Sequence, residues 1–281
     1  MSENKQLCVI HANCQGEPLA GLLQLSAEFS RNWDVRHYTN YTREIIPDAD
    51  LERCGLFIYQ HLGEKWGEFS SAALLARLNS RARPLYAAPF CLPNMYFTGG
   101  WPFLVTDIQT DYADTFLNAL IDQQVEKAVI LKLYLHTDIT KFVDLDASLA
   151  ETFRQGEERE RCCSIQVMPL VREQWKRRPL FHTVNHPGKL LCALVANAVL
   201  AELGLEALPE ALVEAFTPEY ANFDMPIHPQ VAAYYGLNYG QAGHEFNIFG
   251  RLMTFERYVS GYIECRKQGM YKEFWGFMQL V

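Results

Sequence analysis

The sequence has 281 residues, of which 49% are hydrophobic and 21% are charged, and its formal net charge is -8. This composition is typical of a globular chain that buries a substantial core, and it argues against disorder over most of the length. The acidic balance argues against a general affinity for nucleic acid or for anionic membranes. An anionic ligand would therefore need a local basic pocket.

The N-terminus does not have the pattern of a secretory signal, because its few apolar residues are soon interrupted by His11 and Asn13. The most apolar stretch, residues 190–203, contains Asn197 and Glu202. It is also shorter than the roughly 18 residues that a membrane-spanning helix needs. We therefore expect a cytoplasmic protein with no membrane span and no nucleic-acid partner.

Eight cysteines are spread along the chain without the paired spacing of a zinc knuckle or of a CxxC motif. Without a signal peptide, a disulfide framework is improbable. Adjacent Cys162 and Cys163 do not readily bridge each other. We expect no metal, and we expect most of the thiols to behave as small buried hydrophobic groups. The eight are Cys8, Cys14, Cys54, Cys91, Cys162, Cys163, Cys192 and Cys265.

The first part of the chain alternates between strand and helix patterns. Short apolar runs predict strands, and apolar residues at helical spacing predict helices. Pro18 suits the first turn of the first helix. Short connections of this kind indicate an α/β fold with a parallel sheet flanked by helices, of Rossmann-like plan. The predicted strands are residues 6–12, 33–38, 55–60 and 84–88, and the predicted helices are residues 18–29 and 70–79.

The second half is predicted to be rich in helices. We predict a single domain over residues 1–281, with a parallel-sheet part at about 1–105 and a helix-rich part at about 106–281. The predicted helices are residues 112–135 with an interruption, 145–163, 164–176, 189–203 and 251–277.

Three of the predicted strands end in polar or reactive residues. The segment HANCQG follows the first strand, YQHLGE ends the third and APFCLPN ends the fourth. In open parallel sheets, ligands bind beyond the carboxyl ends of the strands. This position distinguishes Cys14 from the other cysteines. Backbone N–H groups at the start of the next helix favour a thiolate there and could form part of an oxyanion hole. A buried cysteine that fits a tight turn is the alternative.

A nucleophilic cysteine needs a base, and the segment FHTVNHPGK offers two histidines. His186, which precedes Pro187 and a predicted helix, is the first choice, and His182 is the second. Their spacing of four residues is also found in metal sites, but Pro187 favours a loop and no third ligand is visible. A histidine that is bonded to the backbone is the alternative for both.

Neutral amides at strand ends are suited to orienting a substrate or donating to an oxyanion. A proline-rich loop, residues 224–229, could cover such a site. Basic side chains are candidates for binding phosphates, although charge runs are usually solvated. We assign substrate binding to Gln15, Gln60, His61, Asn94 and His182, and cofactor binding to Asn13, Gly16, Arg83 and Lys189.

Several motifs occur in a recognisable order. They are NCQG (13–16), YQ (59–60), PNMYFTGGWP (93–102), FHTVNHPGKLL (181–191) and MPIHPQVAAYYGL (225–237). Together they resemble the WcbI-type family of bacterial capsule polysaccharide biosynthesis proteins, over about residues 7–237. That family usually has Gly before NCQ, where this chain has Ala12. The resemblance implies an acetyltransferase that binds coenzyme A or acetyl-CoA and O-acetylates a capsular sugar. It also implies Cys14 and His186 as the central pair, with Gln15 and Asn94 beside them.

The order of the motifs is also similar in plan to the SGNH hydrolases, with Cys14 at the position of their serine. Three functions remain open. The first is acetyl transfer to a sugar or polysaccharide precursor, either through an acetyl-cysteine or with His186 activating the sugar hydroxyl directly. The second is a cysteine-dependent thioesterase or deacetylase. The third is a non-catalytic module that binds CoA or a sugar.

Overall fold

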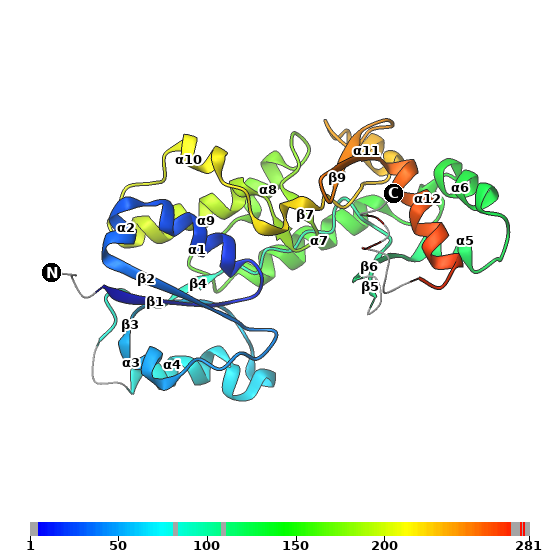
Figure 1. Ribbon diagram of the computed structural model, residues 1–281. Helices are drawn as coiled ribbons and strands as arrows, with labels where there is room; N and C mark the ends of the chain where they lie inside the picture. Colours follow the sequence, from blue (N-terminus) through cyan, green and yellow to red (C-terminus); the bar gives the residue numbers. More distant parts are fainter. Residues whose placement is uncertain (1–4, 81–83, 108–110, 271–275, 277, 279–281) are drawn as a thin grey trace. The chain divides into compact units, whose positions relative to one another are not determined.

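The computed structural model describes residues 5–80, 84–107, 111–270, 276 and 278 (Figure 1). The chain forms two compact units, and each is assembled from separate parts of the sequence. Unit 1 comprises Met1–Tyr96, Gly156–Val171 and Asn185–Glu219, and unit 2 comprises Phe97–Gln155, Arg172–Val184 and Tyr220–Val281. The assignment of the whole chain to one domain stays a prediction.

Unit 1 is built on a four-stranded sheet with the strand order β2-β1-β3-β4. All three strand pairs are parallel. This arrangement confirms the predicted α/β fold with a parallel sheet. The strands are β1 (Gln6–Ala12), β2 (Trp33–Thr39), β3 (Cys54–Gln60) and β4 (Phe90–Leu92).

Helices cover both faces of this sheet (Figure 1). On one face lie α1 (Gly16–Leu25), α2 (Ala27–Asn32) and α9 (Lys189–Glu202), and on the other lie α3 (Asp48–Arg53) and α4 (Ser71–Asn79). Leu7 and Val9 of β1 share one buried hydrophobic cluster with Leu51 of α3 and Leu74 of α4. Burial of large apolar side chains of this kind stabilises the layers by about 1.5–3 kcal/mol each.

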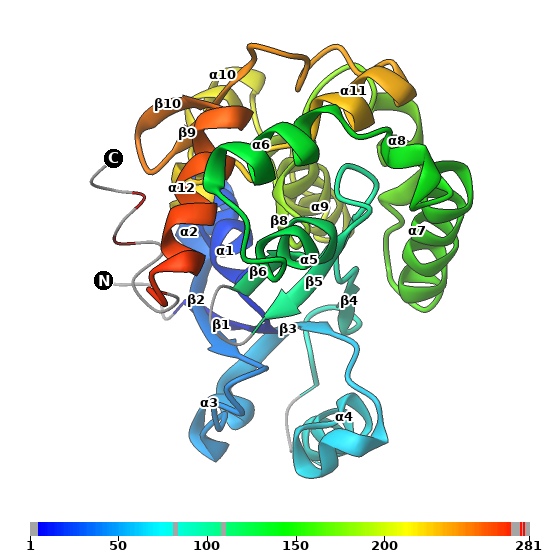
Figure 2. The same ribbon diagram turned by 90° about the vertical axis from the view of Figure 1, so that its right-hand side faces the viewer.

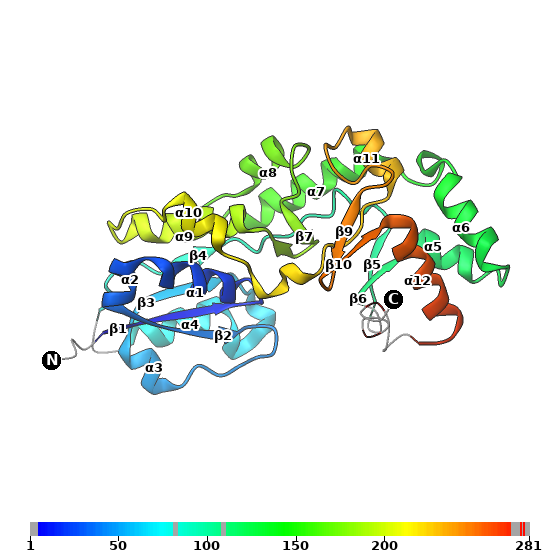
Figure 3. The same ribbon diagram turned by 45° about the horizontal axis from the view of Figure 1, so that its top comes forward.

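Unit 2 combines two antiparallel hairpins with helices. The hairpins are β5 (Leu104–Asp107) with β6 (Asp111–Asp114), and β9 (Glu245–Ile248) with β10 (Arg251–Thr254). The second hairpin leads directly into α12 (Phe255–Lys267) (Figure 3). Helices α5 (Thr115–Ile121), α6 (Lys127–His136) and α12 pack side by side (Figure 2).

Further helices and strands complete the described part of the chain. Within the described residues, no helix combines the length and the hydrophobicity needed to cross a bilayer. The remaining elements are η1 (Glu64–Phe69), η2 (Ile139–Lys141), α7 (Leu145–Glu160), α8 (Met168–Gln174), β7 (Phe181–Thr183), β8 (His186–Pro187), α10 (Glu210–Ala215), η3 (Glu219–Asn222) and α11 (Pro229–Tyr235).

The predicted position of the fourth strand is wrong. Residues 84–88 are irregular, and the strand is β4, which lies within the segment APFCLPN at the end of the predicted strand. Pro89 and Pro93 flank β4 and cannot donate to a sheet, which is consistent with its length of three residues. Tyr86, in the predicted strand, has 62% of its surface exposed.

The predicted helices of the second half are shorter than expected. The helix predicted for residues 112–135 begins as strand β6, and the Asp114 side chain then accepts the N–H of Leu117 and caps α5. The helix predicted for residues 164–176 covers only Met168–Gln174. The closing helix covers only Phe255–Lys267, because residues 251–254 of its predicted range form strand β10. Residues 271–275 and 277 of that range lie outside the described residues.

A buried carboxylate ties β2 to α3. Asp50, which is 3% exposed, accepts hydrogen bonds from the Tyr38 hydroxyl and, at 2.5 Å, from the Arg36 guanidinium. Burial raises the pKa of Asp50, but the hydrogen bonds from Tyr38 and Arg36 outweigh it. The pKa therefore lies below its ordinary value.

We expect Asp50→Asn to lower the free energy of unfolding by about 2 kcal/mol at neutral pH, because it removes the charge from these hydrogen bonds. Since the folded pKa is lowered, this stability is present above about pH 4 and is lost as the pH falls through the folded value. Urea unfolding should therefore show a smaller difference in the free energy of unfolding between wild type and variant at acidic pH than at neutral pH. Asp48→Asn, at an exposed ion pair with Arg77, is the control. An equal cost for Asp48→Asn would contradict this account.

Candidate functional site

The candidate site is a tight turn at the carboxyl edge of the unit 1 sheet, between β1 and α1. The Asn13 side-chain oxygen accepts the N–H of Gln15 at 2.9 Å, and the Asn13 carbonyl accepts the N–H of Gly16 at 2.9 Å. This local bonding is typical of asparagine turns. A Cβ atom at Gly16 would lie 2.4 Å from Nε2 of His37, so the turn requires glycine there. Cys14 lies within this turn.

The buried side chain of Gln15 joins this turn to two distant segments. It is 3% exposed. Its Nε2 donates to the carbonyl of Met95 at 2.7 Å and to the carbonyl of Asn185 at 2.8 Å, while its Oε1 accepts the N–H of Met95 at 3.1 Å. Asn185 directly precedes His186. The NHP segment is therefore bonded to the turn that carries Cys14.

Gln60, at the end of β3, extends the same network. It is 2% exposed. Its Oε1 accepts the N–H of Asn13 at 2.8 Å and the side-chain amide of Asn40 at 3.3 Å. Its Nε2 donates to Gln15 Oε1 at 3.1 Å and to the carbonyl of Pro93 at 3.5 Å. Both glutamine amides have protein partners for their donors and acceptors, so we infer that they position the site. Substrate contact by either amide stays a prediction.

Two other predicted substrate residues, Asn94 and His61, are exposed. The Asn94 side-chain oxygen accepts from Nδ2 of Asn13, the residue before Cys14, at 3.4 Å. The backbone N–H of His61 donates to the sulfur of Cys91. A ligand can reach these two side chains from solvent, and their role in substrate binding stays a prediction.

The thiol of Cys14 is half-buried, and its pKa is raised. Burial raises its pKa above the ordinary value, a backbone N–H bond offsets this only in part, and the Glu17 carboxylate in the first turn of α1 raises it further. The backbone N–H group therefore favours the thiolate, as expected, but burial of the sulfur outweighs this contribution.

His186 lies in β8 and is half-buried. Pro187 is also extended, and α9 begins only at Lys189, after Gly188. Pro187 is therefore not the first helical residue. The pairing of the Cys14 sulfur with the His186 imidazole stays a prediction.

Lys189 and Arg83 are the two cations predicted to bind phosphate, and the structure describes only Lys189. The Lys189 ammonium, in the first turn of α9 as expected, lies 2.7 Å from the Glu214 carboxylate and donates to the Glu214 carbonyl at 2.7 Å. A phosphate contact would require this pair to open. Arg83 lies outside the described residues.

His182 belongs to unit 2, where it pairs with Asp224. Nδ1 of His182 lies 2.7 Å from a carboxylate oxygen of Asp224, and the other oxygen accepts the N–H of Asn247 at 3.3 Å. A carboxylate that accepts the Nδ1 proton leaves Nε2 as the basic nitrogen. The pair borders a pocket of unit 2. Its aromatic lining consists of Phe97, Trp101, Trp175, Phe181, Tyr239 and Phe246.

The sequence analysis missed three features of these sites. Asn40 directly follows β2, so the rule that polar residues gather at strand ends could have identified it. His37 lies inside β2, with its Nε2 3.2 Å from the carbonyl of Ala12, and no pattern indicates that contact. Asp224 was assigned only to a covering loop, because its partner His182 is 42 positions earlier.

The comparisons with known proteins agree with the motifs. Residues 7–208 match the family described as polysaccharide biosynthesis enzyme WcbI. The chain belongs to the WcbI family. The match includes the NCQG turn and the NHP segment, so the family resemblance of the sequence is confirmed. It ends before Asp224.

A solved WcbI structure has a similar fold. It is described as the native protein without a disulfide bond between coenzyme A and its Cys14. It aligns with 99% of this chain and 98% of its own chain, at 15% identity and a TM-score of 0.73. No curated protein matches the sequence.

We expect Gln15→Ala to lower the free energy of unfolding by about 3 kcal/mol, because it leaves buried carbonyl and N–H groups without partners. Denaturant unfolding measures the loss. Gln24→Ala, at an exposed position of α1, the helix that follows Gln15, is the control and should change stability by less than about 0.5 kcal/mol. Similar losses in the two variants would contradict the role of the buried amide.

Alkylation of Cys14 should require alkaline conditions. The thiolate is the reactive form, and burial raises the pKa of Cys14, so the rate should reach half its maximum above the ordinary cysteine value of about 8.5. Peptide mass spectrometry after iodoacetamide treatment at a series of pH values resolves this residue. The same peptide in denaturant is the reference. A midpoint below that of the denatured chain would show that the thiol is activated after all.

Proposed function

We propose that this chain is a CoA-dependent O-acetyltransferase, which moves an acetyl group from acetyl-CoA to a hydroxyl of a sugar in a surface polysaccharide or its precursor. Membership of a family of polysaccharide biosynthesis enzymes supports the acceptor class. The description of the WcbI structure links coenzyme A to a cysteine of that protein, and this chain carries Cys14 at a strand-to-helix turn. We assign the sulfur end of CoA to this turn.

The bond from Gln15 to Asn185 is the observation that supports this proposal most. Gln15 follows Cys14, and Asn185 precedes His186, so one buried amide anchors the segments that carry the thiol and the imidazole. A thiol and a base from segments 170 positions apart would otherwise need separate supports. The shared anchor favours Cys14 and His186 as the central pair.

The raised pKa of Cys14 favours direct transfer over an acetyl-cysteine intermediate. In direct transfer, His186 accepts the proton of the sugar hydroxyl while the sugar oxygen attacks the thioester carbonyl. The carbon–sulfur bond of acetyl-CoA then breaks, and the leaving CoA thiolate takes the proton from the imidazolium. In this route, Cys14 contacts the thioester sulfur without forming a bond to the acetyl group. The covalent route would first require His186 to remove the Cys14 proton.

Acetyl transfer by variants tests this proposal. We expect Cys14→Ala to keep most of its kcat with a raised KM for acetyl-CoA, whereas His186→Ala should lose about 10²–10⁴-fold in kcat. Mass spectrometry of the acetylated acceptor, together with release of the CoA thiol, measures the rate. His182→Ala is the matched histidine control.

Other outcomes would assign the chemistry differently. Loss of transfer in Cys14→Ala, with an acetylated Cys14 peptide in wild type, would establish the covalent route. Loss in His182→Ala alone would move the base to the pair with Asp224. CoA release that does not depend on a sugar acceptor would contradict transfer and favour a thioesterase. CoA binding without any turnover would favour a binding module.

A further inference from the structure

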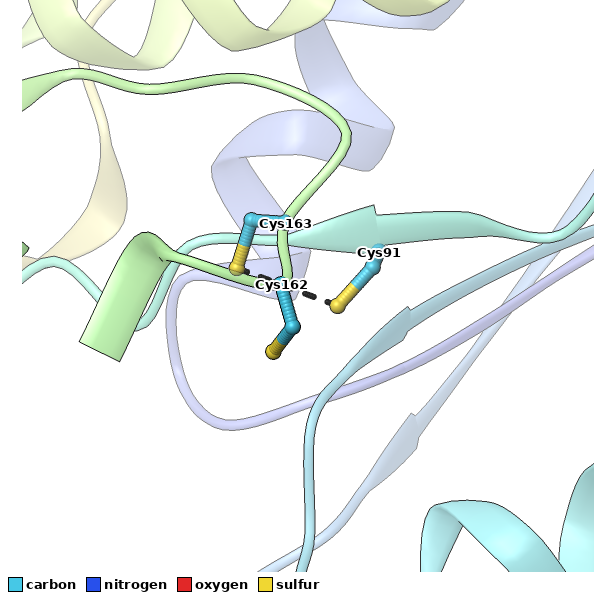
Figure 4. Close-up of side chains that lie close together, drawn as sticks. All are labelled: Cys91, Cys162 and Cys163. Atoms are coloured by element: carbon cyan, nitrogen blue, oxygen red, sulfur yellow. Dashed lines mark hydrogen bonds between the residues drawn. The ribbon is translucent and has the colours of Figure 1, made fainter. Parts of the chain in front are cut away.

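Three cysteines of unit 1 form a cluster that does not include Cys14. Cys91 lies on β4, and Cys162 and Cys163 follow α7. Their sulfur atoms all lie within 4.8 Å of one another, and those of Cys91 and Cys163 are 3.8 Å apart (Figure 4). Cys91 is buried, Cys163 is partly buried and Cys162 is exposed. Solvent therefore has access to the cluster from one side.

Backbone hydrogen bonds hold the two segments of this thiol cluster together. The N–H of Ser164 donates to the Cys91 carbonyl at 2.8 Å, and the N–H of Cys91 donates to the Ser164 hydroxyl at 2.9 Å. The buried Glu160 carboxylate accepts the N–H groups of Val167 at 2.8 Å and Met168 at 3.1 Å, which closes the loop. The cysteines are therefore positioned by bonds that do not involve their side chains.

Hydrogen-bonding groups surround the sulfur of Cys91. It shares a hydrogen bond with the sulfur of Cys163 at 3.8 Å. This bond contributes most, and together with bonds to the Tyr59 hydroxyl and the backbone N–H of His61 it lowers the pKa of Cys91, although burial raises it. The geometry of the three sulfur atoms, and not their acidity, defines the cluster.

We propose that Cys91, Cys162 and Cys163 bind a zinc ion through three thiolates, with the fourth position open to water. Tetrahedral bonds of about 2.3 Å to zinc separate two sulfur atoms by about 3.8 Å. The sulfur atoms of Cys91 and Cys163 already have this separation. Thiolates are the ligands that zinc and other soft ions prefer, and among the described residues the cluster consists of three cysteines without a carboxylate.

Binding exchanges protons for the metal. The ion displaces the thiol protons into solvent, including the one that Cys163 donates to the Leu92 carbonyl at 3.2 Å. The Tyr59 hydroxyl and the His61 N–H stay as donors to the Cys91 thiolate. Such outer donors orient a ligand and typically change metal affinity by about 10–100-fold.

Titration of the reduced full-length protein with Co²⁺ tests the site. We expect one equivalent to bind with thiolate-to-cobalt charge-transfer absorption, which Zn²⁺ then displaces. Cys162→Ser changes an exposed side chain and should keep the fold, yet it should weaken binding by at least about 100-fold. Cys91→Ser should do the same. Cys14→Ser removes a thiol outside the cluster and should leave the titration unchanged.

Tyr59→Phe separates the hydrogen bond from the packing of the ring. The Tyr59 ring stacks on Phe57 with centroids 5.6 Å apart, and phenylalanine preserves that contact. We expect affinity for Co²⁺ and Zn²⁺ to fall by about 10-fold. This result would assign the hydroxyl to the outer sphere of the metal.

The proposal fails if the reduced wild type shows no charge-transfer band, or if Cys162→Ser binds as tightly as wild type. It also fails if Cys91 and Cys163 form a disulfide on exposure to oxidant while the reduced protein binds no metal, because the cluster is then a redox pair. Metal binding, not activity, is the readout. The result is therefore independent of the function proposed for Cys14 and His186.

Discussion

The pair of buried amides at the carboxyl edge of the sheet constrains the rest of unit 1. Burying an amide without partners costs several kcal/mol, so Gln15 and Gln60 are tolerated only where donors and acceptors meet them. Their partners come from the β1–α1 turn, from the end of β2, from the segment after β4 and from the NHP segment. No one of these segments can move without leaving a buried polar group unpaired. The geometry around Cys14 follows from this requirement.

Hydrophobic patterns predicted the elements that are buried on both faces. Strands β1 and β3 are continuous apolar runs, and α9 is apolar almost throughout, so their positions could be predicted to within a residue or two. Strand β4 could not, because three residues between two prolines are too few to show a period. The rule on strand ends correctly indicated where Cys14, Gln15, Gln60 and Asn94 gather. It could not indicate that Gln15 bonds to the Asn185 carbonyl, since backbone groups carry no sequence signal.

Two thiols of this chain show why a local motif does not determine acidity. Cys14 precedes a helix, which favours the thiolate, but burial and the nearby Glu17 raise its pKa. Cys91 lies in a strand, where no rule predicts activation, yet donors from β3 and from the loop after α7 lower its pKa. The spacing rules for metal sites seek ligands within a few residues of one another. Cys91 and Cys163 are 72 positions apart, so a rule based on short spacing could not detect this cluster. The expectation of no metal rested on that rule.

Strand β4 links the thiol cluster to the amide network. Cys91 is followed at once by Leu92 and Pro93, whose carbonyls accept from Cys163 and from Gln60. Two residues further along, the backbone of Met95 bonds to both polar atoms of the Gln15 side chain. A restraint on the sulfur of Cys91 therefore acts on the same short segment that holds the turn of Cys14.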